Sequence, residues 1–214
     1  MPDSELVHIT LSPRGAGPEP HPCLVLLHGR GSNEQDLPAL VPALPPELFV
    51  VSVRAPFSFS GSGYAWYQLQ SMGVPDEPTF QQSLNLLQPF LSNLPQRYPI
   101  DPRRVFLGGF SQGAMMCASI TLIHPALVRG TAVLSGYLPN IELPSDRPGC
   151  AGKPVFLAHG REDSVLPLAM GHDARRRLEE LGLAVEYHEY AMDHQVVPAE
   201  LDDLSAWLRA RLAS

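Results

Sequence analysis

The sequence has few cysteines, and their spacing forms no recognisable pattern. Cys23, Cys117 and Cys150 are its three cysteines, and they are far apart, odd in number and outside any C-x-x-C pair. A disulfide framework and a thiolate zinc site both need paired or closely spaced cysteines. Neither is indicated here.

Long hydrophobic segments are also missing. No uninterrupted apolar run reaches the roughly 18 residues that suggest a membrane-spanning helix. The chain begins Met-Pro-Asp-Ser-Glu-Leu, without the basic and apolar regions of a signal peptide. We therefore expect no membrane span, no signal peptide and a cytoplasmic location.

Positive charge is scarce. The chain has 15 Lys and Arg against 22 Asp and Glu, a net charge of -7. This balance argues against nucleic acid or an anionic membrane surface as the main partner. With 44% hydrophobic and 17% charged residues, the composition is that of an ordinary globular protein. A length of 214 residues suits a single domain over residues 1–214.

Apolar runs alternate with amphipathic stretches along the chain, which is typical of α/β proteins. Continuous apolar runs predict strands buried on both faces of a parallel sheet. We therefore predict a mostly parallel sheet with helices on both faces, in which ligands bind beyond the carboxyl ends of the strands. The expected strands are 6–11 (an edge strand), 23–27, 48–53, 105–107, 130–134, 155–158 and 184–190; the expected helices are 80–98, 114–123, 168–181 and 198–212.

Other segments are less regular. Ser32 and Asn33 are candidate caps for a short helix that ends near residue 41. Residues 54–79 lack periodicity, a property of functional or disordered segments. Pro89 and Pro95 are expected to kink or shorten the helix predicted over 80–98. Residues 137–153 are expected to form a proline-rich loop.

One motif connects a predicted strand with a predicted helix. Gly109-Phe110-Ser111-Gln112-Gly113 matches G-x-S-x-G, the pattern of a nucleophile elbow when it lies between a strand and a helix. A serine on such a sharp turn needs neighbours without Cβ, because the chain passes close to itself. The amino end of the following helix stabilises negative charge near the serine oxygen. We predict that Ser111 is a nucleophile.

A serine nucleophile needs a base and a carboxylate that orients the base. In this fold class the order along the chain is Ser, then Asp or Glu, then His. His194 follows the last predicted strand, where a loop can return to the sheet, and Asp163 follows the strand predicted over 155–158. Glu162 and Asp193 are rival acids, whereas His172 and His188 are expected to be structural. We predict a triad of Ser111, Asp163 and His194.

An oxyanion hole needs two backbone N–H groups that point at one oxygen. The N–H of Gln112 and the N–H of Arg30, in the Gly-rich loop after the first buried strand, are the candidates. His28 is expected to hold that loop in place. The candidate substrate-binding residues are Trp66, Tyr67, Leu138 and Leu166, although Trp66 and Tyr67 would equally suit packing of their loop.

These motifs together resemble the phospholipase/carboxylesterase family of α/β-hydrolases, which includes the acyl-protein thioesterases. The resemblance covers nearly the whole chain, and the Leu-His-Gly-Arg-Gly motif is similar to the bacterial carboxylesterase branch. It rests on six ordered motifs: Leu27-His-Gly-Arg-Gly31, Tyr64-Ala-Trp-Tyr67, Gly109-Phe-Ser-Gln-Gly-Ala114, Leu134-Ser-Gly-Tyr-Leu-Pro139, His159-Gly-Arg-Glu-Asp163 and Met192-Asp-His194.

The resemblance implies a small hydrolase without a cap domain. It also implies the same triad, the same two oxyanion donors and frequent homodimers. The chain differs from the family pattern at two positions. Gln68 stands where the family often has Asp, and Asp193 stands where it often has Gly.

We therefore predict a serine hydrolase that cleaves carboxylic esters of short to medium acyl chain through an acyl-enzyme intermediate. No cofactor and no metal are expected, and the expected partner is a small-molecule ester. An acyl-thioesterase or a lysophospholipase with the same triad is an alternative, and so is a non-catalytic ligand-binding protein. A metal-dependent hydrolase that uses His28, His159, Asp163 and His194 is a further alternative, but these residues lack a compact ligand spacing.

Overall fold

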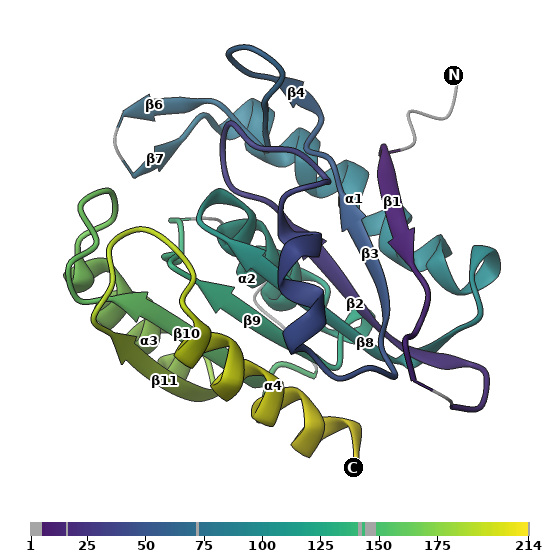
Figure 1. Cartoon of the computed structure of the whole chain (residues 1–214). Coiled ribbons are helices and arrows are strands. Elements are labelled where there is room, and N and C mark those ends of the chain that lie inside the picture. Colours follow the sequence, from purple (N-terminus) through teal and green to yellow (C-terminus); the bar gives the residue numbers. More distant parts are fainter. Residues whose placement is uncertain (1–5, 16, 72, 141–142, 144–148, 214) are drawn as a thin grey trace.

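A seven-stranded sheet forms the centre of the molecule (Figure 1). The computed structural model describes residues 6–15, 17–71, 73–140, 143 and 149–213. β1 is antiparallel to β3, and the other neighbouring strands are parallel. In spatial order the strands are β1 (His8–Leu11), β3 (Phe49–Val53), β2 (His21–Leu27), β8 (Ile100–Phe110), β9 (Gly130–Leu134), β10 (Pro154–Gly160) and β11 (Ala184–Tyr190).

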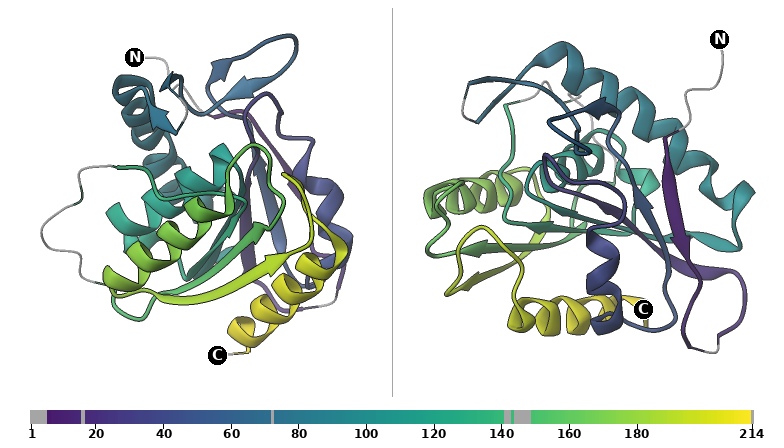
Figure 2. Two further views of the ribbon diagram at one scale, coloured as in Figure 1. Left: turned by 90° about the vertical axis from the view of Figure 1, so that its left-hand side faces the viewer. Right: turned by 45° about the horizontal axis from the view of Figure 1, so that its top comes forward.

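Helices cover both faces of this sheet, as the left view of Figure 2 shows. One face carries α1 (Glu77–Arg97), α2 (Gln112–Ile123) and α3 (Leu168–Glu180). The other carries the 3-10 helix η1 (Leu37–Ala43) and α4 (Pro198–Leu212). A short 3-10 helix, η2 (Pro125–Leu127), follows α2. The predicted mostly parallel sheet between two helical layers is confirmed. Within the described residues, none of the helices has the length and apolar character needed to cross a membrane.

The inner strands are buried on both faces, which explains their continuous apolar runs. Every residue of β3 and of β9 is buried. Apolar clusters fill the space between the sheet and each helical layer. Each large apolar side chain buried in this way contributes about 1.5–3 kcal/mol. These layers hold the carboxyl ends of the strands in fixed positions.

The irregular segment over residues 54–79 folds into two small hairpins. Its strands are β4 (Phe57–Ser58), β5 (Tyr64–Ala65), β6 (Leu69–Ser71) and β7 (Val74–Pro75). β4 pairs with β5 and β6 with β7, both antiparallel. The first hairpin is tied to the loop after β2, because the N–H of Gly31 donates to the oxygen of Tyr64 at 2.8 Å. Residue 72 lies outside the described residues.

The helix α1 is not shortened by its internal prolines, because it runs through both of them. It is also longer than predicted, since Asp76 caps its start by accepting a hydrogen bond from the N–H of Thr79. Each internal proline lowers the stability of a helix by about 3 kcal/mol. Burial of the apolar face, at about 1.5–3 kcal/mol per side chain, outweighs that cost. The buried apolar residues of α1 are Phe80, Leu84, Leu87, Phe90, Leu91 and Leu94.

Other strands and helices agree with their predicted ranges to different degrees. β9, β11 and α4 match their predicted ranges, and β1 is the predicted edge strand. The predicted caps of the short helix were wrong, because η1 begins after Asp36. Instead, the hydroxyl of Ser32 donates to the Asp36 carboxylate and the side-chain oxygen of Asn33 accepts from the N–H of Gln35. Residues 141–142 and 144–148 of the predicted proline-rich loop lie outside the described residues.

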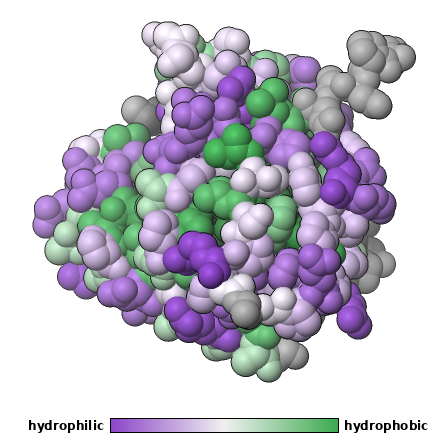
Figure 3. All heavy atoms as spheres, turned by 45° about the vertical axis from the view of Figure 1, so that its right-hand side comes forward, coloured by the Kyte–Doolittle hydropathy of each residue, from purple (hydrophilic) through white to green (hydrophobic). Residues whose placement is uncertain are grey.

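The surface has polar and apolar areas. On the face in Figure 3, hydrophilic residues surround smaller areas of hydrophobic ones. The large hydrophobic side chains exposed in the described part of the chain are Val7, Ile9, Val74 and Val165.

Candidate active site

Ser111 lies at a sharp turn between β8 and α2. Its backbone φ is 52°, in a region that non-glycine residues seldom adopt. A Cβ on Gly109 would lie 2.5 Å from the carbonyl carbon of Gly113, and a Cβ on Gly113 would lie 2.5 Å from the carbonyl carbon of Leu27. Both glycines of the motif are therefore required by close backbone contacts. The strained φ occurs at the residue whose side chain must project from the turn.

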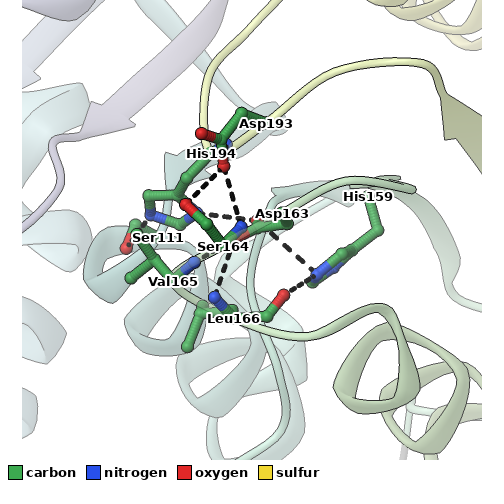
Figure 4. Close-up of polar contacts among 8 residues, drawn as sticks. All are labelled: Ser111, His159, Asp163, Ser164, Val165, Leu166, Asp193 and His194. Carbon is green, nitrogen blue, oxygen red and sulfur yellow. Dashed lines mark hydrogen bonds and ion pairs between the residues drawn. The ribbon is translucent and has the colours of Figure 1, made fainter.

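His194 connects Ser111 to a buried carboxylate (Figure 4). It lies in the loop between β11 and α4, and its Nε2 is 2.9 Å from the Ser111 hydroxyl oxygen. Its Nδ1 is 2.8 Å from Oδ2 of Asp163. Because a carboxylate only accepts hydrogen bonds, Nδ1 carries the proton and Nε2 is left to accept from the serine. The ring of Phe110, 4.9 Å away between centroids, packs against the imidazole.

Asp163 is held by its own loop. It follows β10 and is only 7% exposed. Its Oδ1 accepts hydrogen bonds from the N–H groups of Val165, at 2.9 Å, and Leu166, at 2.7 Å. These two bonds fix the carboxylate so that Oδ2 faces the imidazole. The sequence motif did not predict these two donors, since they depend on the turn that the loop adopts.

His159 also contacts the loop that holds Asp163. It is fully buried, and its Nε2 lies 2.7 Å from the Leu166 carbonyl oxygen and 3.7 Å from Oδ2 of Asp163. A Cβ on Gly171 of α3 would lie 2.8 Å from the His159 ring, so the helix packs directly on it. The sequence named His159 only as a candidate metal ligand. The structure places it in contact with the loop that holds Asp163.

The oxyanion candidates lie on two adjacent loops. Gln112 is the first residue of α2, where backbone N–H groups have no partner in the helix. Gly29, next to Arg30, lies beside Ser111, and a Cβ on it would be 3.5 Å from the Ser111 Cβ. Among the described residues, neither the N–H of Arg30 nor that of Gln112 donates to a protein acceptor. Both remain available to an oxygen of a substrate.

The Gln112 side chain has a role that sequence analysis missed. Its Oε1 accepts from the N–H of Trp66 at 2.7 Å, and its Nε2 donates to the Tyr67 carbonyl oxygen at 2.8 Å. This buried amide joins the nucleophile turn to the chain between the two hairpins. The residue type was visible in the sequence, but its partners are more than forty positions away along the chain.

His28 holds the loop after β2, as expected. Its Nε2 accepts from the N–H of Ala55 at 3.0 Å, so the ring is protonated at Nδ1, which donates to the Gly29 carbonyl oxygen at 2.7 Å. Burial lowers the pKa of His28 below its usual value, and the bond to Gly29 opposes this only in part. The indole N–H of Trp66 donates to the His28 carbonyl oxygen at 2.9 Å.

A cavity of about 490 Å³ opens beside Ser111. Of the four predicted substrate-binding residues, Tyr67 and Leu166 line it. Leu138 instead lines a neighbouring cavity of about 350 Å³. Trp66 is fully buried and lines neither cavity, in keeping with a packing role. The residues around the main cavity are Arg30, Phe59, Tyr67, Leu69, Ser71, Gly73, Ser111, Gln112, Met115, Tyr137, Val165, Leu166 and His194.

The residues of the metal-site alternative are not arranged as a ligand set. Within the described part of the chain, no three His, Cys, Asp or Glu side chains are grouped so that they could hold a metal ion. His172 pairs with Glu189 at 2.7 Å and His188 with Glu186 at 3.2 Å. Both rings therefore contact carboxylates away from Ser111.

The sheet, the strained serine turn and the loops at the carboxyl ends of β8, β10 and β11 define an α/β-hydrolase. The chain belongs to the phospholipase/carboxylesterase family, whose model matches residues 15–212. It is a carboxylic ester hydrolase, a serine hydrolase of the carboxylesterase or thioesterase type. The expectation from the sequence motifs is thereby confirmed at the level of family and enzyme class.

Individual relatives agree with this assignment. The chain is 27% identical to the putative hydrolase MhqD of Bacillus subtilis over 87% of this chain and 92% of that one. It is 32% identical to acyl-protein thioesterase 1 of Gibberella zeae over 69% and 68% of the two chains. Among solved structures, a Bacillus cereus carboxylesterase superposes with a TM-score of 0.86 at 25% identity, over 97% of this chain and 95% of that one. Esterase PE8 superposes with a TM-score of 0.82 at 28% identity, over 96% and 99%.

Proposed function

We propose that the protein hydrolyses carboxylic esters with Ser111 as nucleophile, His194 as general base and Asp163 as the carboxylate that orients the base. The observation that carries this proposal is the continuous hydrogen-bonded chain from Ser111 through His194 to Asp163, with distances of 2.9 and 2.8 Å. A hydroxyl, an imidazole and a buried carboxylate in this order form the arrangement that activates a serine.

The reaction has two halves. Ser111 Oγ attacks the ester carbonyl carbon while its proton moves to Nε2 of His194, and the N–H groups of Arg30 and Gln112 receive the oxyanion. The C–O bond to the alcohol then breaks, and the imidazolium returns its proton to the departing alkoxide. Water, deprotonated by His194, attacks the acyl-enzyme, and collapse of the second tetrahedral intermediate releases the acid and restores Ser111.

The size and lining of the cavity favour short to medium acyl chains. Apolar side chains of the second hairpin, α2 and the loop after β10 form much of its wall, including Leu69, Met115 and Leu166. In the described residues, the segments beside the cavity are two small hairpins and loops rather than a helical cap. A medium acyl chain therefore has an apolar surface to bind, without a deep enclosed channel for a long one.

Thioester hydrolysis is the second candidate. It needs the same nucleophile, base and oxyanion donors, and two of the relatives are acyl-protein thioesterases, from Gibberella zeae and Saccharomyces cerevisiae. Gln68 is exposed and does not line the cavity, so its departure from the family pattern leaves the acyl site unchanged. Homodimer formation stays a prediction.

A rate comparison tests the proposal. p-Nitrophenyl esters from acetate to palmitate are measured beside thioesters of the same acids, with wild type and Ser111→Ala. We expect the highest kcat/KM at short to medium oxygen esters and a loss of about a thousandfold or more in the variant. Equal rates in wild type and variant would instead support the ligand-binding protein. A consistent preference for thioesters would move the assignment to an acyl-thioesterase.

A further inference from the structure

The catalytic cavity has an unusual charge for this protein. The chain carries a net charge of -7, yet none of the described residues that line the cavity is Asp or Glu. Apart from the imidazole of His194, Arg30 is the one ionisable cation among those lining residues. A positive charge on the wall of a mainly apolar cavity attracts an anionic group of a bound molecule.

The Arg30 side chain packs against an aromatic ring of the cavity wall. Its Cζ lies 4.3 Å from the centroid of the Phe59 ring, and Phe59 also lines the cavity. The loop is fixed beside it, because the N–H of Gly31 donates to the Tyr64 carbonyl oxygen and the N–H of Tyr64 donates to the Ser32 carbonyl oxygen, both at 2.8 Å. No carboxylate in the described residues forms an ion pair with Arg30. The guanidinium is therefore positioned by stacking, and its N–H donors remain available.

The arginine of the neighbouring cavity is different. Arg177 donates to the carbonyl oxygens of Leu138 and Pro139 and lies 3.6 Å from the Asp173 carboxylate. Its charge is already balanced and its donors are occupied, so it serves the fold. In the part of the chain that the structure describes, Arg30 has no carbonyl or carboxylate partner of this kind.

The charge of Arg30 also acts on a residue inside the cavity. Burial raises the pKa of the Tyr67 hydroxyl well above its usual value, and the nearby Tyr137 raises it further. The positive charge of Arg30 opposes this rise. Arg30 and Tyr67 both line the cavity.

We propose that Arg30, besides its backbone N–H, contributes a side-chain subsite that binds a single carboxylate of the ester substrate. This deepens the proposed function and depends on it. A guanidinium matches a carboxylate in shape and offers two parallel donors. One positive charge balances one carboxylate, whereas a phosphate monoester, with about −1.5 to −2 charges at neutral pH, would keep an unbalanced negative charge.

The test uses matched esters that differ in one charge. On the acyl side these are mono-p-nitrophenyl glutarate and its methyl ester. On the alcohol side they are p-carboxyphenyl acetate and its methyl ester. A third ester with a phosphate monoester in place of the carboxylate compares the two anions. Each kcat/KM is measured after subtraction of the spontaneous rate, and the quantity compared is the ratio of anionic to neutral ester.

Arg30→Gln is expected to lower this ratio about tenfold on at least one side of the ester, since it removes a charge-assisted contact. Arg30→Lys should retain part of the preference, and Arg30→Glu should reverse it. Added salt should reduce the wild-type ratio. The control is Arg103→Gln, since Arg103 is an exposed arginine that does not line the cavity and pairs with Asp101. It should leave the ratio unchanged.

An unchanged ratio in Arg30→Gln on both sides of the ester would overturn the proposal and leave the guanidinium a packing partner of Phe59. A larger Arg30-dependent ratio for the phosphate ester than for the carboxylate would also overturn it. These results are distinct from failure of the proposed function. In that case wild type and Ser111→Ala would hydrolyse the neutral esters at the same rate.

Discussion

The carboxylate of Asp193 binds Ser164 and does not orient the imidazole beside it. Its Oδ1 accepts from both the N–H and the hydroxyl of Ser164 at 2.8 Å, and also from the N–H of His194 at 2.7 Å (Figure 4). These hydrogen bonds, those from Ser164 first, lower the pKa of Asp193 below its usual value. Asp193 therefore joins the loop of His194 to the loop of Asp163.

The two aspartates should respond differently to the same substitution. Asp163→Asn presents an amide to Nδ1 of His194 and favours the wrong tautomer, so we expect kcat to fall by about ten-thousandfold. Asp193→Asn retains an oxygen where all three donors meet, so its kcat should stay within about tenfold of wild type. Steady-state kinetics on one activated ester measures both. Comparable losses in the two variants would contradict the assignment of Asp163 as the acid.

Because Gly113 packs against the backbone of Leu27, a larger residue at this position should greatly lower the stability of the fold. In Gly113→Ala the new Cβ would meet the backbone carbonyl of Leu27, which cannot move without displacing β2. We expect the free energy of unfolding to fall by more than about 3 kcal/mol, measured by urea denaturation. Gly17→Ala is the matched control, because in the described residues no atom beyond its chain neighbours lies within 4 Å of its Cβ position. Similar stabilities of the two variants would contradict the close contact.

A buried acid makes stability depend on pH. Glu200, in the first turn of α4, is 0% exposed, and burial raises its pKa to about 8, opposed in part by the N–H of Val197. Between the ordinary value of 4.5 and about 8, the folded protein keeps a proton that the unfolded chain has released. The stability contribution of Glu200 is therefore complete at low pH and is lost as the pH rises through this window.

The variant Glu200→Gln replaces the titrating carboxyl group with a neutral amide of nearly the same shape. Its unfolding free energy minus that of wild type should increase as the pH rises from about 5 to about 8, by at most about 1.4 kcal/mol per pH unit. Denaturant unfolding of both proteins across the window measures the difference, in which the other titrating groups cancel. A difference that stays constant with pH would show that Glu200 does not titrate there.

Much of the fold was predictable from the sequence, because the strands and the last helix have unambiguous apolar patterns. β9, β11 and α4 were predicted with the bounds that the structure gives. The long helix α1 was less predictable, since local proline propensity opposes it and only tertiary burial of its apolar face decides the outcome. The hairpins over residues 54–79 also depend on partners elsewhere, such as the loop of Gly31.

The candidate site was likewise predictable only in part from the sequence. The sequence motif singled out Ser111, and chain order singled out Asp163 and His194. The structure brings these three side chains together, because loops at the carboxyl ends of parallel strands meet at one edge. The supporting contacts could not be derived in this way. The amide of Gln112 and the ring of His159 act through backbone groups whose positions follow only from the folded loops.

Covalent labelling measures the central claim most directly. A fluorophosphonate probe reacts with a serine that is activated by a neighbouring base, so wild type should be modified once, on Ser111. Ser111→Ala should remain unlabelled, and His194→Ala should label far more slowly. Peptide mass spectrometry locates the adduct, and circular dichroism verifies that the variants are folded. Absence of labelling in folded wild type, or an adduct on another residue, would contradict a nucleophilic Ser111.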